Sequence, residues 1–282
     1  MPIFSKHDLE FFDQNGYVIW HDAVPQNNLQ AVIDVIFEFL GMNPNDPNDW
    51  YREPHRTNGM VELYQHQALW NNRQHPRIHQ AFSEIYGTEK LWASEDRACM
   101  KPPMHTDHPD YDHKGFTHWD VDTGKLPQPL RVQGVLALTD TTADMGGFQC
   151  VPGFHRDLDK WIAAQPDDRN PYQPDLNALP PGMQVTPIPM KAGDLLIWTT
   201  LLAHGNGHNV SGKSRLAQYI TMSPARESDE EEKLARIDRW QNRKKPPYER
   251  AFPGDSRRLE ELHGTTAELT PLGRKLLGLE TW

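Results

Sequence analysis

Hydrophobic residues in the first ninety positions recur at helical spacing. Between Pro25 and Gly41 they fall three or four residues apart, which predicts a helix opened by the proline and ended by the glycine. Ser5 is a suitable N-cap for an earlier helix, which Gly16 ends. The pattern therefore predicts helices over residues 5–14, 25–40, 62–72 and 76–86, with a short strand over 17–20.

From Leu91 onward the pattern changes to short apolar runs separated by Gly, Pro and Asp. Such runs are typical of strands bounded by turns, and their spacing suits a β-sandwich or barrel. The predicted strands are 91–100, 116–121, 132–139, 148–151, 185–189, 194–200 and 216–222.

Three segments complete the pattern. Residues 156–184 are rich in Pro and Asp and predict a surface excursion, whereas the charged stretch 226–245 predicts an exposed helix. A last helix should open at Thr270-Pro271. Because no repeat or linker divides the chain, we expect a single domain that is mainly β with flanking helices. Its expected parts are N-terminal helices over about 5–86, a β core over about 91–222 and a C-terminal helical extension over about 224–282.

Composition and charge exclude several classes of function. A net charge of -10 argues against nucleic acid as a partner, because phosphate binding needs a basic surface. No run of 18 apolar residues predicts a membrane span, and no signal peptide is readable at the N-terminus. Two cysteines without a Cys-x-x-Cys pair fit a reducing compartment, so we expect a cytoplasmic protein.

Candidate metal ligands crowd between residues 105 and 120. Three His-x-Asp pairs occur there: His105 with Asp107, His108 with Asp110, and His118 with Asp120. Residues i and i+2 of a strand point to the same face, so a pair on a strand can grip one metal ion. The first two pairs lie in a Pro- and Asp-rich loop, whereas 116–121 alternates like a strand. We therefore favour His118 and Asp120 and read the other histidines as surface residues near the mouth of the site.

A second histidine would close the ligand set from a distant part of the chain. His204 follows the end of a predicted buried strand, whereas His208 lies beyond Gly205-Asn206-Gly207 in a flexible turn. Rigid elements hold ligands better than loops do, so His204 is favoured. Two imidazoles and one carboxylate are the donor set of mononuclear non-haem iron(II) sites.

Arg215 opens the predicted strand that follows these histidines. A guanidinium presents a fixed fork of donors suited to a carboxylate, and a buried one needs an anionic partner. A metal site beside such an anchor suggests an oxygenase that consumes a keto acid.

The ordered motifs between about residue 4 and residue 222 resemble the phytanoyl-CoA dioxygenase family of iron(II)/2-oxoglutarate oxygenases. Each motif is weak singly, but their order and spacing together are specific. They are Asn15-Gly16-Tyr17-Val18, Arg97, Lys101-Pro102, His118-Trp119-Asp120, Leu138-Thr139-Asp140, Gly146–His155, Gly193-Asp194, His204-Gly205 and Arg215. The resemblance implies a double-stranded β-helix, also called a jelly-roll or cupin-like core, with iron at its open end. It also implies that His118, Asp120 and His204 bind iron and that Arg215 pairs with the far carboxylate of 2-oxoglutarate.

Other cosubstrate contacts are expected where this chain departs from the family pattern or flanks it. Asn206 stands where family members often have Ser, and its amide can still donate to a carboxylate. Gln133 and Cys99 are further candidates for cosubstrate contact, and Arg97 and Lys101 are weaker ones. The C-terminal 60 residues lie outside the motifs, and two roles stay open for them: a lid over the site or a contact in a homodimer.

The expected activity is oxidation of a small, polar metabolite with Fe(II), 2-oxoglutarate and O2, releasing succinate and CO2. Family relatives that halogenate replace the metal-binding carboxylate with a small residue. Asp120 is present here, which favours hydroxylation over halogenation. The alternative is a cupin-type metalloenzyme, an isomerase or ring-cleaving dioxygenase, that needs the metal ligands but neither Arg215 nor a keto acid.

Overall fold

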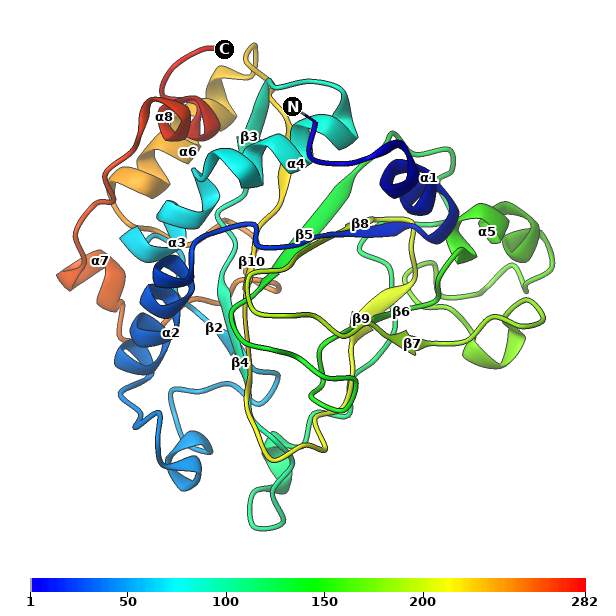
Figure 1. The fold of residues 1–282 in the computed structure, drawn as a ribbon, viewed down its shortest axis with the longest axis horizontal. Coiled ribbons are helices and arrows are strands. Elements are labelled where there is room, and N and C mark those ends of the chain that lie inside the picture. Colours follow the sequence, from blue (N-terminus) through cyan, green and yellow to red (C-terminus); the bar gives the residue numbers. More distant parts are fainter. Residues whose placement is uncertain (1) are drawn as a thin grey trace.

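The computed structural model describes residues 2–282, and in it short strands alternate with helices (Figure 1). The helices are α1 Lys6–Asn15, α2 Gln26–Leu40, α3 Gln67–Arg73, α4 Pro76–Tyr86, α5 Phe154–Ala163, α6 Glu230–Gln241, α7 Leu259–His263 and α8 Pro271–Leu277. The strands are β1 Tyr17–Trp20, β2 Met60–Val61, β3 Leu91–Ala93, β4 Ala98–Lys101, β5 Val132–Ala137, β6 Phe148–Cys150, β7 Thr186–Pro187, β8 Leu195–Thr199, β9 His204–Asn206, β10 Arg215–Tyr219 and β11 Met222–Pro224.

All strand pairs are antiparallel, and they form three sheets. The largest has six strands in the order β1-β8-β5-β10-β4-β2, and a second has three in the order β7-β6-β9. The pair β11-β3 forms the third. In Figure 1, α2, α3 and α4 lie on one side of the large sheet, whereas β6, β7 and β9 lie on the other.

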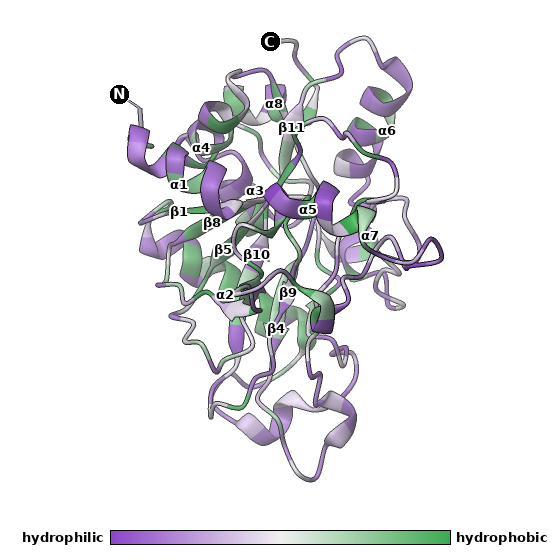
Figure 2. Cartoon of the chain, turned by 90° about the vertical axis from the view of Figure 1, so that its right-hand side faces the viewer, coloured by the Kyte–Doolittle hydropathy of each residue, from purple (hydrophilic) through white to green (hydrophobic). Residues whose placement is uncertain are grey.

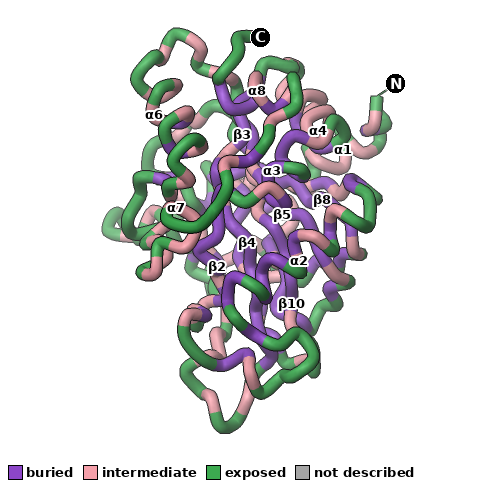
Figure 3. Tube along the Cα trace, turned by 90° about the vertical axis from the view of Figure 1, so that its left-hand side faces the viewer, coloured by how far each residue is buried: buried purple, intermediate pink, exposed green. Residues whose placement is uncertain are grey.

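The central strands are buried on both faces because each face meets a different layer. Along β8, Leu195 and Ile197 join the core beneath α2, whereas Leu196 and Trp198 join the core shared with Phe148 of β6. This alternation follows from the two-residue period of a strand. It explains why the sequence shows a continuous apolar run here, and Figure 3 shows the same central strands as buried.

Several predicted elements are confirmed at their boundaries. Ser5 and Asp8 form a reciprocal capping box at α1, and Gly16 ends that helix with a positive φ of 83°. Gly41 ends α2 in the same left-handed conformation, and α4 begins and ends as predicted. Pro25 is the N-cap of α2 rather than its first helical residue.

Other predictions were wrong. Helical residues outnumber strand residues, so the fold is mixed rather than mainly β. The helix predicted from residue 62 begins only at Gln67, because Met60–Val61 pairs with β4. The surface excursion predicted over 156–184 is wrong in its first part, which belongs to α5 and whose Leu158 and Trp161 are buried against Trp119. The predicted strands 91–100 and 216–222 are each interrupted, giving β3 with β4 and β10 with β11.

The C-terminal residues pack onto the main body of the fold. The buried guanidinium of Arg236 in α6 donates to the carbonyl oxygens of Ala93 in β3 and Leu277 in α8. Helix α6 presents a largely polar surface outward (Figure 2), and its buried residues are Arg236 and Arg239. Among residues 2–282, no helix combines the length and the apolar character that crossing a bilayer requires.

Candidate metal centre

His118 and His204 come together through the backbone before their side chains meet. The two residues exchange both backbone hydrogen bonds, at 2.8 and 3.0 Å, as an antiparallel bridge. His204 begins β9, so the bridge attaches residue 118 to the edge of the three-stranded sheet. The strand predicted over 116–121 was wrong in extent, because its only ladder contact within the described chain is this bridge.

Two glycines allow the segment before His118 to approach β9 closely. A Cβ on Gly205 would collide with the carbonyl oxygen of Phe116, and one on Gly115 would collide with the carbonyl oxygen of Asn206. Gly115 also has a positive φ of 78°. The glycine that follows His204 therefore permits the bridge that brings the two imidazoles together.

Gly205→Ala is expected to separate His118 from His204, because the added methyl group cannot fit against the Phe116 carbonyl without moving one segment. We expect affinity for Fe(II) to fall at least tenfold, with a smaller loss of thermal stability. Calorimetric titration with Fe(II) under anaerobic conditions measures the first effect. Gly212→Ala is a suitable control, because a Cβ there meets open space. Unchanged iron affinity in Gly205→Ala would show that the close approach is not needed.

The side chains of His118, Asp120 and His204 converge on one point. Their ligand atoms lie within 4.8 Å of one another, and in the described part of the chain no other group of three or more His, Cys, Asp or Glu side chains does so. Nε2 of His118 lies 3.2 Å from Oδ1 of Asp120, and Nε2 of His204 lies 3.4 Å from Oδ2.

The proton positions on these residues favour a cation between them. Nδ1 of His204 lies 2.8 Å from the carbonyl oxygen of Leu202, so this nitrogen carries a proton and donates it. In the neutral ring, Nε2 then presents a lone pair toward the carboxylate of Asp120. A metal ion between them would accept the lone pair of Nε2 and one lone pair of the carboxylate. A backbone carbonyl that accepts from the other ring nitrogen is the usual way in which the tautomer of a ligating histidine is fixed.

Asp120 is held in its charged form. Burial opposes ionisation, but when no metal ion is bound and the imidazoles are protonated, hydrogen bonds and charge attraction from His118 and His204 outweigh it and lower the pKa of this carboxyl below its usual value. Nε2 of Gln133 also donates to Oδ2 of Asp120, at 2.8 Å. Gln133 is therefore placed to orient the carboxylate, while its own Oε1 is buried without a hydrogen-bond partner among residues 2–282.

A cavity of about 390 Å³ opens onto the three converging side chains. That volume suits a small molecule. Aromatic rings form much of its wall, and they come from distant parts of the chain: Phe116, Phe148, Trp198, Tyr219 and Phe252. Asn206, Gln133, Asp96 and Arg97 also line it.

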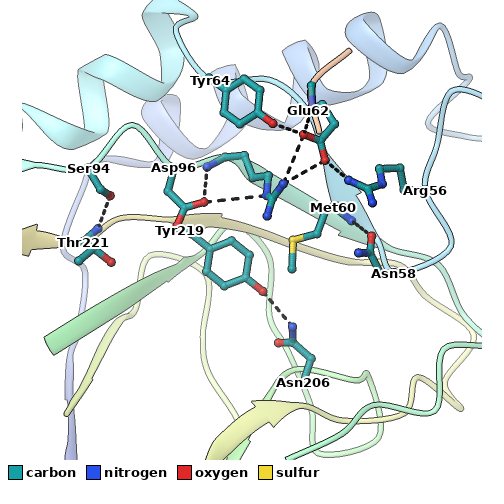
Figure 4. Close-up of polar contacts among 12 residues, drawn as sticks. Arg56, Asn58, Met60, Glu62, Tyr64, Ser94, Asp96, Asn206, Tyr219 and Thr221 are labelled. Atoms are coloured by element: carbon teal, nitrogen blue, oxygen red, sulfur yellow. Dashed lines mark hydrogen bonds and ion pairs between the residues drawn. The ribbon is translucent and has the colours of Figure 1, made fainter. Parts of the chain in front are cut away.

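Arg215 lies behind this wall rather than on it. Its Nη1 lies 3.3 Å from the hydroxyl oxygen of Tyr219 and 3.3 Å from the sulfur of Cys99. The Tyr219 hydroxyl in turn accepts a hydrogen bond from Asn206 at 3.0 Å (Figure 4). Tyr219 and Asn206 thus connect the guanidinium to the cavity, whereas Cys99 is buried against Arg215 and does not line it.

A second buried cation lies next to Arg215. Lys101 of β4 is its directly opposite partner across the sheet, and no carboxylate of the described residues forms an ion pair with either side chain. The Lys101 ammonium donates to the carbonyl oxygen of Gly207, and burial lowers its pKa to about 8. Two buried cations without an acidic partner indicate a place for an anion.

The rival histidines lie elsewhere. His105 and His108 pack against the ring of Tyr51, and neither lines the cavity. His208 forms an ion pair with Asp112 in the neighbouring loop. Spacing alone could not have separated these residues from His118 and His204.

Three residues that line the cavity belong to none of the motifs identified in the sequence. Tyr219 appears only as an apolar position of a predicted strand, and Phe252 lies in the C-terminal region outside the motifs. Asp96 precedes Arg97, which was a candidate only through its place ahead of the metal pair. Tyr219 could have been found, because the period of two places it on the same face as Arg215, four residues earlier.

An antiparallel fold that converges two imidazoles and a carboxylate on a cavity defines the class of mononuclear non-haem iron proteins. Within that class, the family model "Phytanoyl-CoA dioxygenase (PhyH)" matches residues 12–217, so the chain belongs to the phytanoyl-CoA dioxygenase family. This confirms the resemblance identified in the sequence.

Individual relatives are distant but extend along most of the chain. "Dioxygenase olcK" of Penicillium canescens is 26% identical over 288 residues, covering 97% of this chain and 80% of the relative. The crystal structure of GIG2 from Candida albicans has a TM-score of 0.72 at 14% identity and covers 99% of this chain and 77% of that one. The epimerase SnoN, solved with Fe3+, alpha-ketoglutarate and nogalamycin RO, has a TM-score of 0.56 at 17% identity, covering 78% and 83%. At these identities the structures establish the fold.

Proposed function

We propose that this chain is an iron(II)- and 2-oxoglutarate-dependent oxygenase that hydroxylates a C–H bond of a small molecule. The observation that carries the proposal is the convergence of His118, Asp120 and His204 on a cavity behind which Arg215 lies without an acidic partner. We assign those three side chains as the iron ligands. Three protein ligands leave positions open for a cosubstrate and dioxygen.

The cosubstrate would lie between the iron ligands and the buried cations. Arg215 would bind the far carboxylate of 2-oxoglutarate, with Asn206 and the Tyr219 hydroxyl as neighbouring donors. Lys101 supplies further positive charge next to Arg215. Cys99 stays a prediction as a direct contact, and its position beneath the guanidinium supports a role in placing Arg215.

With both groups bound, sites of this kind couple decarboxylation of the keto acid by dioxygen to oxidation of a substrate C–H bond. The protein's own contribution is positioning and exclusion of water. Gln133 restrains the Asp120 carboxylate, and the Leu202 carbonyl fixes the ring of His204. The rings of Phe148 and Trp198 contact His204 and shield its side from solvent.

Hydroxylation is favoured because Asp120 fills the position at which a halide would bind if a small residue stood there. The structural neighbours include an epimerase and a carbocyclase, so the fold by itself does not determine the reaction. The alternative remains a cupin-type metalloenzyme without 2-oxoglutarate. The buried cations Lys101 and Arg215, which form no ion pair with a carboxylate of the described residues, favour use of a keto acid over this alternative.

We also propose that the six-stranded and three-stranded sheets are the two halves of a double-stranded β-helix. The apolar core between them, which includes Phe148, Leu196 and Trp198, supports this interpretation. The packing of α6 and α8 on β3 supports treating residues 1–282 as one domain.

The test is an anaerobic titration of the purified protein with Fe(II) and then 2-oxoglutarate. Chelation of iron by the keto acid should produce a weak visible charge-transfer band. Zn(II) in place of Fe(II) is the control, because it has no accessible redox state or d-electron transition. Admission of oxygen with a metabolite library should then release succinate. A featureless spectrum with iron would contradict the proposal.

A further inference from the structure

We propose that the Asp96 carboxylate is the substrate anchor of this cavity and that it selects a compact molecule carrying a protonated amine. The inference rests on the proposed function, since it names the substrate class of the same site. Among the described residues, Asp96 carries the one carboxylate that lines the cavity besides that of Asp120, which belongs to the proposed metal site.

Asp96 lies in the short connection between β3 and β4, and its backbone and one carboxylate oxygen are fixed. Its carbonyl oxygen accepts a hydrogen bond from the buried guanidinium of Arg73. Its Oδ1 accepts from the backbone N–H of Arg97 at 2.8 Å. Its Oδ2 has no hydrogen-bond partner in residues 2–282, and the side chain is 26% exposed at the cavity wall. A rigidly held carboxylate thus presents one free oxygen to whatever enters.

Arg97 is the neighbouring cation, but its charge is directed to a different carboxylate. Its Nη1 lies 3.0 and 3.3 Å from the two carboxylate oxygens of Glu62, whereas its Nε lies 4.0 Å from Oδ1 of Asp96. Arg56 also pairs with Glu62, at 2.5 Å (Figure 4). The cluster is neutral in total, and the shortest ion pairs of both guanidinium groups are with Glu62 rather than with Asp96.

The arrangement around Arg97 prevents an easy exchange of partners. The ring of Phe252 covers its guanidinium, with Cζ 4.4 Å from the ring centroid. Glu62 is itself held by the Tyr64 hydroxyl and by the backbone N–H of Gly254 at 3.2 Å. Phe252 and Gly254 come from the C-terminal region, so that region helps to hold Arg97 against Glu62.

The electrostatics agree with a missing cation. Burial raises the pKa of the Asp96 carboxyl, and the charges of Arg97 and Arg73 only partly oppose the increase. A protonated amine at Oδ2 would supply the close positive charge that the carboxylate lacks. Phe116 and Phe148 line the same cavity and offer apolar surface to the carbon skeleton of such an amine. Because the cavity of about 390 Å³ must also hold the cosubstrate, the amine has to be compact.

The experiment compares matched pairs of probes on the wild type and Asp96→Asn. The pairs are phenethylamine with N-acetylphenethylamine, cyclohexylamine with N-cyclohexylacetamide, and proline with N-acetylproline. Each acetylated member keeps the carbon skeleton and loses the positive charge. Binding is measured anaerobically by calorimetry with metal and 2-oxoglutarate present, and the charge-transfer band is recorded in parallel. Asp107→Asn, on an exposed loop outside the cavity, is the matched control.

We expect at least one amine to bind the wild type more tightly than its acetylated partner. Asparagine keeps the shape and the acceptor for the Arg97 N–H, so Asp96→Asn should fold. The substitution should weaken binding of that amine roughly 10- to 100-fold, as loss of a charged hydrogen bond implies. It should leave binding of the acetylated partner unchanged. No preference for an amine in any pair, or a preference that Asp96→Asn preserves, would overturn the proposal. A missing charge-transfer band would instead count against the proposed function, because calorimetry reports amine binding without it.

Discussion

His204→Ala is expected to abolish stoichiometric binding of Fe(II), whereas His208→Ala should retain most of it. His204 is buried, begins β9, and directs Nε2 at Asp120 while Nδ1 is fixed by a backbone carbonyl. His208 pairs with Asp112 in a loop and does not line the cavity. Removing one of three ligands leaves two donors, which hold a borderline divalent ion far more weakly.

Anaerobic equilibrium dialysis against Fe(II) measures both variants directly. His108→Ala is a further control, since its ring stacks on Tyr51 and we expect nearly unchanged affinity. The folded state of each variant is checked by circular dichroism, because His204 also bridges to residue 118 through its backbone, which alanine preserves. If His208→Ala lost iron and His204→Ala kept it, the ligand assignment would be reversed.

The parts of the fold that could be predicted from sequence are those that local signals determine. A capping box at Ser5 and glycines at helix ends specify α1, α2 and α4 without reference to the rest of the chain. Segment 116–121 could not be predicted in the same way. It resembles a strand in composition, but only His118 finds a ladder partner, opposite the first residue of β9. Helix α5 was missed because the Pro- and Asp-rich residues after it dominated the pattern of the whole insert.

The residues of the candidate site also divide into those that local sequence identifies and those that only long-range contacts reveal. The three proposed ligands could be selected because the rival His-x-Asp pairs lie in a Pro- and Asp-rich loop and His208 lies in a Gly-rich turn. Asp96 and Phe252 could not, because their significance depends on contacts between residues far apart in sequence. Arg215 lies between these cases. Its residue type predicted an anion site, but only the structure shows that Tyr219 and Asn206 stand between the guanidinium and the cavity.

Arg215→Leu is expected to abolish consumption of 2-oxoglutarate while leaving iron binding intact. The guanidinium is buried, and its polar contacts among residues 2–282 are the weak acceptors Cys99 and Tyr219. A carboxylate bound by the two parallel N–H groups of an arginine gains two charge-assisted hydrogen bonds. Their loss should weaken binding of 2-oxoglutarate roughly 100-fold or more. The charge-transfer titration reports this affinity, and calorimetry with Fe(II) alone reports the metal site.

Stability separates this functional loss from a folding defect. A buried charge without an ionic partner carries a desolvation cost, and replacing such groups with apolar ones is often neutral or stabilising. Arg215→Leu should therefore melt at or above the wild-type temperature in the absence of 2-oxoglutarate, and 2-oxoglutarate should stabilise only the wild type. Arg215→Lys is the matched variant: it keeps the charge but not the fork, so its affinity should fall between the two. An Arg215→Leu protein that still bound 2-oxoglutarate normally would favour the cupin-type alternative, because that mechanism makes no use of a carboxylate anchor.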